Sequence, residues 1–112
     1  MKTTEASIAL TALAHESRLE VFRLLVKESP EGLCAGDLSR MLGIPKPTMS
    51  FHLKELSFAG LIDSERLGRS IKYRLQNKKM QQLMQFLMED CCQGRPELCL
   101  PKGSKSASCS DC

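Results

Sequence analysis

The chain has 112 residues, 42% of them hydrophobic, which suits one small domain with a modest core. Tryptophan is absent and aromatic residues make up only 4%, which argues against an aromatic-lined pocket or a base-stacking platform. The sequence has no apolar run long enough to span a membrane and no secretory signal pattern at its N-terminus. A cytoplasmic protein with no membrane partner is therefore expected. Its six cysteines would be reduced there and would serve as ligands or redox groups.

Positive charge is concentrated in the middle of the chain. Residues 45–79 contain eight Lys or Arg against three acids, a net charge of +5, while the whole chain carries +3 and the remainder therefore −2. A basic segment on a nearly neutral body is typical of proteins that bind nucleic-acid phosphates. A solvated charged face is the alternative interpretation of this pattern.

Apolar residues at helical spacing predict four helices in the first part of the chain, over residues 4–14, 16–27, 35–42 and 47–58. The second helix is expected to be central, because its apolar residues, including Leu19 and Val26, cover a broad stripe. Met41 is expected to face inward from the third helix. Gly43 suits the end of that helix, and Pro47 suits the first turn of the next, where its missing N–H has no helical partner. Two helices joined around a glycine form a helix-turn-helix signal.

After Gly60 the apolar spacing changes from helical to alternating. Residues 61–67 and 71–75 are typical of two strands, and Gly68 lies at the tight turn between them. The predicted fold class is therefore mainly α with one β-hairpin, a winged helix-turn-helix.

The last helix is predicted to begin at Asn77, which can cap it, and to end at Gly94 and Pro96. Its apolar stripe has a regular 3.6-residue period and consists of Met80, Leu83, Met84, Leu87, Met88 and Cys91. The predicted division is a DNA-binding and dimerisation domain over residues 1–92. A cysteine-containing, largely flexible tail over residues 93–112 follows this domain.

Three linked segments carry a family resemblance: LAHESRLEVFRLL at 13–25, GIPKPTMSFHLKELSFAGLI at 43–62 and GRSIKYRL at 68–75. In this order they resemble the ArsR/SmtB family of bacterial metal-sensing repressors, over about residues 5 to 92. The resemblance implies a repressor rather than an enzyme, binding double-stranded operator DNA as a homodimer. Pro45 departs from the family pattern, which has a polar capping residue there, so the recognition helix must satisfy its first N–H groups otherwise.

The recognition helix of such a protein lies in the major groove, with its N-terminal part on the base edges. With Met49, Leu53 and Leu56 inward, the outward DNA-binding candidates are Lys46, Thr48, Ser50, Phe51, His52 and Lys54. Lysines suit phosphate or guanine, and Phe51 can contact a thymine methyl. A core aromatic and a structural histidine are the alternative interpretations of Phe51 and His52. Arg66 and Arg69, beside the hairpin tip, would contact flanking phosphates or the minor groove unless the turn is only solvated.

The apolar stripe of the last helix lies outside the helix-turn-helix core. The resemblance implies dimerisation through the first and last helices, and packing of the stripe within its own chain is the alternative. A dimer doubles the DNA contacts and recognises a two-fold symmetric site.

Two sensor sites known in the family are incomplete in this chain. Cys34, at the start of the third helix, matches one position of a Cys-x-Cys pair, but Gly36 occupies the other. Cys34 is therefore interpreted as a small buried residue. The last helix has no histidine, since His15 and His52 lie elsewhere, and this argues against the family's zinc site.

The remaining candidate is EDCCQGRPELC at 89–99, which resembles the arsenic-responsive subgroup of the family. Cys91 and Cys92 end the last helix, and Gly94 allows the chain to reverse so that Cys99 can return toward them. Three thiolates suit a soft, three-coordinate ion. Arsenite is the predicted effector, antimonite is a second, and no catalytic cofactor is expected.

Several alternatives to this interpretation stay open. Zinc or cadmium would need a fourth ligand, for which Cys109 and Cys112 are candidate accessory residues. A methylated arsenical would need only two thiols. A redox switch or a DNA-binding module with no effector would also fit. A thiol oxidoreductase or arsenate reductase is disfavoured, because Cys91 and Cys92 lie at a helix C-terminus beside acidic residues, where a reactive thiolate is poorly stabilised.

Overall fold

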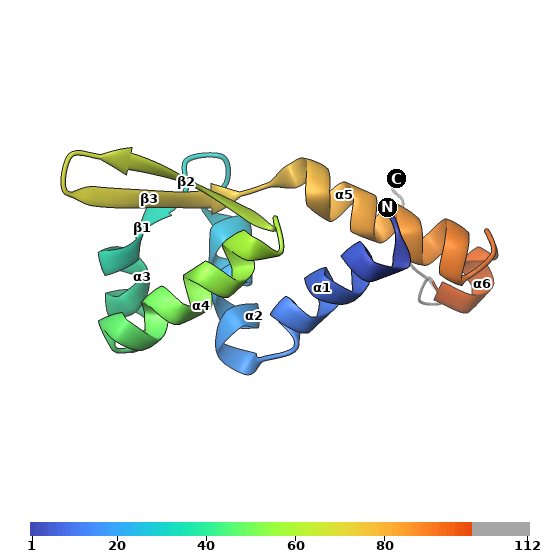
Figure 1. Ribbon diagram of the computed structural model, residues 1–112, viewed down its shortest axis with the longest axis horizontal. Coiled ribbons are helices and arrows are strands. Elements are labelled where there is room, and N and C mark those ends of the chain that lie inside the picture. The colour runs from blue at the N-terminus through green and yellow to red at the C-terminus, as the bar shows by residue number, and fades with distance from the viewer. Residues whose placement is uncertain (100–112) are drawn as a thin grey trace.

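The computed structural model describes residues 1–99, apart from the side chains of Pro96 and Cys99. Its elements are α1 (Thr3–Leu13), α2 (Glu16–Lys27), β1 (Leu33–Cys34), α3 (Ala35–Leu42), α4 (Lys46–Phe58), β2 (Ile62–Leu67), β3 (Ser70–Leu75), α5 (Asn77–Gln85), η1 (Phe86–Cys91) and α6 (Pro96–Cys99). The predicted mainly helical, winged helix-turn-helix architecture is confirmed (Figure 1). None of the helices in this part of the chain is long and apolar enough to cross a membrane.

The wing is the β2–β3 hairpin, which projects from one end of the molecule (Figure 1). The two strands pair antiparallel, with Arg66 opposite Ile71 and Leu67 opposite Ser70, and Gly68 turns the chain with a φ of 64°. A third strand, β1, pairs with β3 to complete a sheet of order β1-β3-β2. Strand β1 could not be predicted from the sequence, because a strand of two residues shows no alternation.

The core lies where α2 and α4 meet, and α1 and α5 extend it toward the other end of the molecule (Figure 1). Fully buried side chains come from all four helices: Ala6, Ala9, Val21, Leu25, Met49, Leu53, Leu56 and Leu83. The inward positions predicted for the recognition helix are therefore correct. Three expected core residues are exposed instead, namely Leu19, Val26 and Met41. They lie at the edges of their stripes, where helical spacing does not show which positions a neighbouring element covers.

The last helix changes its hydrogen bonding before it ends. It is α-helical as far as Gln85, and η1 is a π-helical turn, after which the Cys92 N–H reaches the Leu87 carbonyl at 3.1 Å. A π turn inserts extra chain into each turn and rotates the residues after it. The regular 3.6-residue period predicted as far as Cys91 is therefore wrong for this last turn.

The chain reverses directly after η1. Gly94 has a φ of 68°, as its predicted role requires, and Gln93 also has a positive φ, 58°. Helix α6 then lies against η1. Residues 96–99 are thus helical within the segment from residue 93 that the sequence predicts to be largely flexible, and the flexibility of that segment stays a prediction.

Candidate DNA-binding surface and sensor cysteines

The recognition helix α4 starts from a tight turn after α3. Gly43 ends α3 in the left-handed conformation, and Pro45 is the N-cap residue of α4 without a side-chain hydrogen bond. The Pro45 carbonyl accepts the Met49 N–H at 2.8 Å, and the helix starts without a polar side-chain cap. The exposed residues on α4 include Lys46, Thr48, Ser50, Phe51 and Lys54. Phe51 is 53% exposed, so it lies on the surface rather than in the core.

His52, a predicted DNA contact, lies inside the molecule. Its side chain is only 4% exposed, and its ring lies 4.7 Å from that of His15, between centroids. Arg18 Nε donates a hydrogen bond to His52 Nδ1 at 3.3 Å. Burial, together with the neighbouring His15 and Arg18, lowers the pKa of His52. The neutral ring is therefore favoured. This geometry supports the interpretation of His52 as a structural histidine rather than a DNA contact.

Arg18 links several parts of this region and was not among the residues predicted from the sequence. Its guanidinium bonds His52, lies 5.7 Å from the centre of the Phe51 ring, and donates from Nη1 to the Ala12 carbonyl at 3.3 Å. An arginine on a helix that was predicted to be central was the available signal, because a charged group near a core needs partners.

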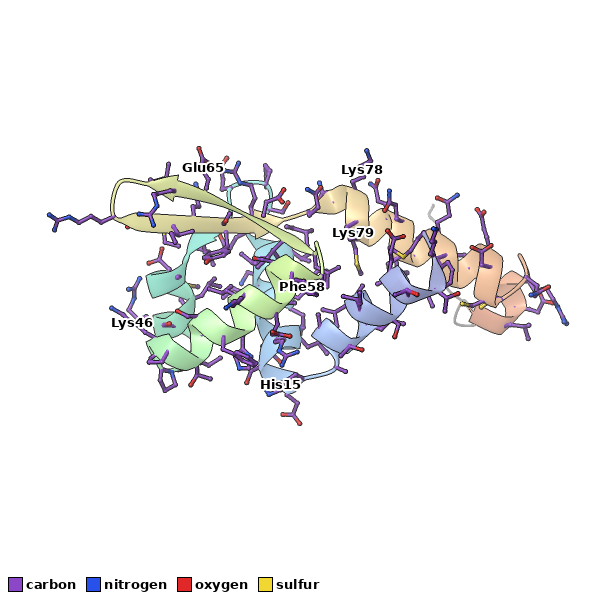
Figure 2. All side chains as sticks on the ribbon, in the orientation of Figure 1. His15, Lys46, Phe58, Glu65, Lys78 and Lys79 are labelled. Atoms are coloured by element: carbon purple, nitrogen blue, oxygen red, sulfur yellow. The ribbon has the colours of Figure 1, made fainter. Side chains whose placement is uncertain are left out.

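The positively charged side chains on the recognition helix and the wing tip lack, within the described residues, the acidic partners that those farther from the wing tip have. Lys72 lies 4.0 Å from Glu31, and Arg74 pairs with Glu65 across the hairpin. By contrast, four of the side chains predicted to contact DNA have no ion-pair partner within residues 1–99: Lys46, Lys54, Arg66 and Arg69. Figure 2 shows Lys46 at the end of the molecule from which the wing also projects. These unpaired cations are available to DNA phosphates.

The predicted sensor cysteines lie at the end of the last helix. Cys91 is exposed and free, whereas Cys92 is half-buried and disulfide-bonded. Cys99 ends α6, which lies against η1, although its side chain is outside the described part. Cys109 and Cys112 also lie outside the described residues. Within the described part, no three His, Cys, Asp or Glu side chains are close enough together to hold a metal ion.

Cys34 occupies a different place in the fold. It is the last residue of β1 and the N-cap residue of α3, free and half-buried rather than fully buried. Gly36 stands where a second thiolate would be needed, and a side chain added there would meet open space. The described geometry offers Cys34 no second thiol on α3.

Comparison with known proteins identifies the family. A helix-turn-helix domain family matches residues 13–65. The chain is 34% identical over 91 residues to the biofilm growth-associated repressor of Agrobacterium fabrum, covering 81% of this chain and 75% of that protein. It is 41% identical over 66 residues to the transcriptional repressor SmtB of Mycobacterium tuberculosis, covering 59% and 47%. It is 33% identical over 74 residues to the cadmium resistance regulatory protein CadC of Listeria innocua, covering 66% and 60%.

A solved structure supports the fold independently. An ArsR-like transcriptional regulator from Rhodococcus sp. RHA1 matches with a TM-score of 0.71 at 24% identity, covering 85% of this chain and 87% of that one. The sequence relatives are transcriptional regulators or repressors rather than enzymes. The chain belongs to the ArsR/SmtB family of winged helix-turn-helix transcriptional repressors.

Proposed function

We propose that this repressor binds operator DNA as a homodimer and releases it when trivalent arsenic binds Cys91, Cys92 and Cys99. The observation that carries the proposal is the position of the first two cysteines. Cys91 and Cys92 lie at the end of η1, which continues helix α5. Helix α6, which ends at Cys99, brings the chain back against η1.

DNA binding through α4 and the wing is supported by the unpaired side chains Lys46, Lys54, Arg66 and Arg69. The exposed side chains of Thr48 and Ser50 add hydrogen-bonding groups near the start of the helix, where base edges are read. The exposed Phe51 suits contact with a thymine methyl. His52 is left out of the proposed contacts, because its buried ring already has Arg18 as a partner.

The homodimer is supported by apolar side chains that remain exposed on α1 and α5. Leu10 on α1 is 42% exposed and Met84 on α5 is 47% exposed, and both helices also contribute buried side chains to the same core cluster. The apolar stripe on the last helix has a buried part and an exposed part, because Leu83 is 1% exposed and already packs within its own chain. A symmetric partner would cover the exposed part and place two recognition helices on one operator.

Arsenic is proposed as the effector because its trivalent form is soft and takes three sulfur ligands. The free Cys91 can supply one thiolate, and Cys92 and Cys99 can supply two more once the disulfide at Cys92 is reduced. Thiolate ligands require reduced cysteines, which the cytoplasm maintains. Binding would tie α6 to η1 through bonds from sulfur to arsenic and thereby change the packing at the dimer end of the molecule.

The chemistry also supports a second candidate effector. The relative from Listeria innocua is named for cadmium resistance, and cadmium is thiophilic as well. A four-coordinate cadmium site would need a further ligand, for which Cys109 and Cys112 are the proposed accessories. The disulfide at Cys92 favours a redox switch as a third candidate.

The decisive experiment follows DNA release by fluorescence anisotropy. A labelled duplex, selected by the protein from a random pool, is titrated in reducing buffer with arsenite, antimonite, cadmium, lead and zinc in parallel. Arsenite is expected to release the DNA from the wild type. A coupling of about 1–3 kcal/mol between the two sites would weaken DNA binding about 5–150-fold.

Variants assign the response to its ligands. Cys91→Ser, Cys92→Ser and Cys99→Ser are expected to bind DNA normally but not to respond to arsenite. Cys34→Ser is the matched control and should respond as the wild type does. A normal response from all three variants would refute the arsenic site, and a response only to cadmium would favour the second candidate. Release by peroxide without any metal would favour the redox switch.

A further inference from the structure

We propose that the pocket between α3, α4 and the wing binds one phosphate of the DNA backbone. The proposal rests on the proposed DNA binding and adds a site that neither the recognition helix nor the wing forms alone. The pocket has a volume of about 510 Å³. Its walls include the first turn of α3, the start of α4 and the wing residues that follow the hairpin tip.

The charged side chains around the pocket are mostly positive. Lys46 comes from α4, Arg69 from the wing tip and Arg40 from α3, whereas Asp37 is the one acid among the lining residues. Arg40 donates to Asp37 at 2.5 Å, which leaves Lys46 and Arg69 unpaired within the described part of the chain. The pocket therefore has a net charge of +2, which suits a phosphate diester.

The backbone of α3 adds hydrogen-bond donors. Residues 34–37 line the pocket, and they include the first turn of this eight-residue helix, whose initial N–H groups have no partner within the helix. Cys34 is the N-cap residue and forms no side-chain cap, so those N–H groups point toward the pocket end of the helix without a side-chain acceptor. An anion is a favourable partner for N–H groups at this end of a helix.

A buried hydroxyl supplies an independent indication of a ligand. Ser39 also lines the pocket, and it is only 8% exposed. Its hydroxyl has no hydrogen-bond partner among residues 1–99. Leaving such a group unpaired costs free energy, and a phosphate oxygen would satisfy it directly or through one water.

The place of the pocket identifies the source of the phosphate. Lys46 and Arg69 are two of the side chains proposed to contact DNA, and they line the pocket from two different elements, α4 and the wing. A DNA backbone that runs from the recognition helix to the wing must pass this opening. DNA is therefore the proposed source, and a free phosphate ion is the alternative that the test distinguishes.

Gly36 allows a test that leaves the fold intact. A side chain added there meets open space, and Gly36 lies in the first turn of α3, where an acidic residue stabilises a helix. Gly36→Glu would place a negative charge at the pocket, and Gly36→Gln would add the same bulk without the charge. Gly36→Glu is expected to weaken binding of a labelled duplex about tenfold or more at about 0.1 M salt, while Gly36→Gln changes it less than about threefold. Asp37→Asn, which removes the acid from the pocket, is expected to strengthen binding.

Each outcome has a distinct meaning. Thermal unfolding should show Gly36→Glu to be at least as stable as Gly36→Gln, so a folding defect would be recognised. If the wild type binds DNA and the two variants bind equally well, the pocket is not a phosphate site. If the wild type binds no DNA at all, the proposed function itself fails. If sodium phosphate raises the Tm of the DNA-free wild type more than sodium chloride does at equal ionic strength, but not that of Gly36→Glu, and if the two Gly36 variants bind DNA equally well, the source is a free ion and the DNA assignment is overturned.

Discussion

Arg18 Nε donates a hydrogen bond to Nδ1 of His52 at 3.3 Å, while Nη1 of the same guanidinium donates to the Ala12 carbonyl, also at 3.3 Å. One side chain of α2 thereby joins the end of α1 to the middle of the recognition helix. Helix α1 belongs to the proposed dimer surface, and α4 belongs to the proposed DNA surface. A change at the dimer surface therefore has a direct physical connection to the helix that would read DNA.

The first prediction concerns the contribution of Arg18 to stability. Arg18→Ala should lower the free energy of unfolding by about 1–3 kcal/mol, because it leaves the buried His52 ring and the Ala12 carbonyl without a donor. Arg23→Ala is the control on the same helix, since Arg23 pairs only with the exposed Glu20. It should change stability by less than about 1 kcal/mol. Urea unfolding measures both, and equal losses would contradict the role of Arg18.

The second prediction is a loss of stability in mild acid. Burial first, and then His15 and Arg18, lower the pKa of His52 from its usual 6.5. The unfolded chain therefore takes up this proton more readily than the folded protein does. The stability that comes from the neutral ring is present above about pH 6.5 and is lost as the pH falls through the lower folded value.

This dependence can be measured by thermal unfolding. The midpoint temperature of unfolding should decrease as the pH is lowered from about 7.5 to about 5.5. This pH range lies above the ordinary pKa of carboxyl groups. His52→Gln removes the titrating ring, so its midpoint should change less over the same range. An identical pH dependence in the variant would show that His52 does not titrate differently in the folded protein.

The third prediction is the salt dependence of DNA binding. Lys54 is an exposed lysine of α4 with no ion-pair partner within residues 1–99. If it neutralises one phosphate, Lys54→Ala should weaken binding to all duplexes and reduce the slope of log K against log salt by about 0.9. Lys27, an exposed lysine at the end of α2, provides the control, and Lys27→Ala should leave the slope unchanged. Equal slopes for both variants would remove Lys54 from the DNA surface.

The fourth prediction concerns oligomeric state. Leu10→Glu and Met84→Glu each place a charge among the exposed apolar residues of α1 or α5. Association would bury this unpaired charge in the interface, so each substitution should favour the monomer. Met41→Glu changes an equally exposed apolar residue on α3 and should leave the association constant unchanged. Sedimentation equilibrium measures all three against the wild type. A wild type that is monomeric at micromolar concentration would contradict the dimer.

Much of the fold could be predicted because its signals are local. Strict alternation at residues 71–75 predicts β3 and a glycine at residue 68 predicts the hairpin turn, since both depend only on neighbouring residues. Gly43 likewise marks the end of α3. The outward positions of Lys46 and Lys54 followed from the spacing of the inward residues on one helix.

The tertiary structure decided what depends on residues far apart in the sequence. His52 and Phe51 are adjacent on α4, yet His52 is buried because α2 brings Arg18 and His15 against it, and Phe51 is exposed. The pocket that leaves the Ser39 hydroxyl without a partner likewise exists only where α3, α4 and the wing meet. The sequence determined which side chains are available and which local elements hold them. Only the packing of those elements determined which of the side chains are desolvated and which stay open to a ligand, because both depend on atoms that the chain brings together from distant positions.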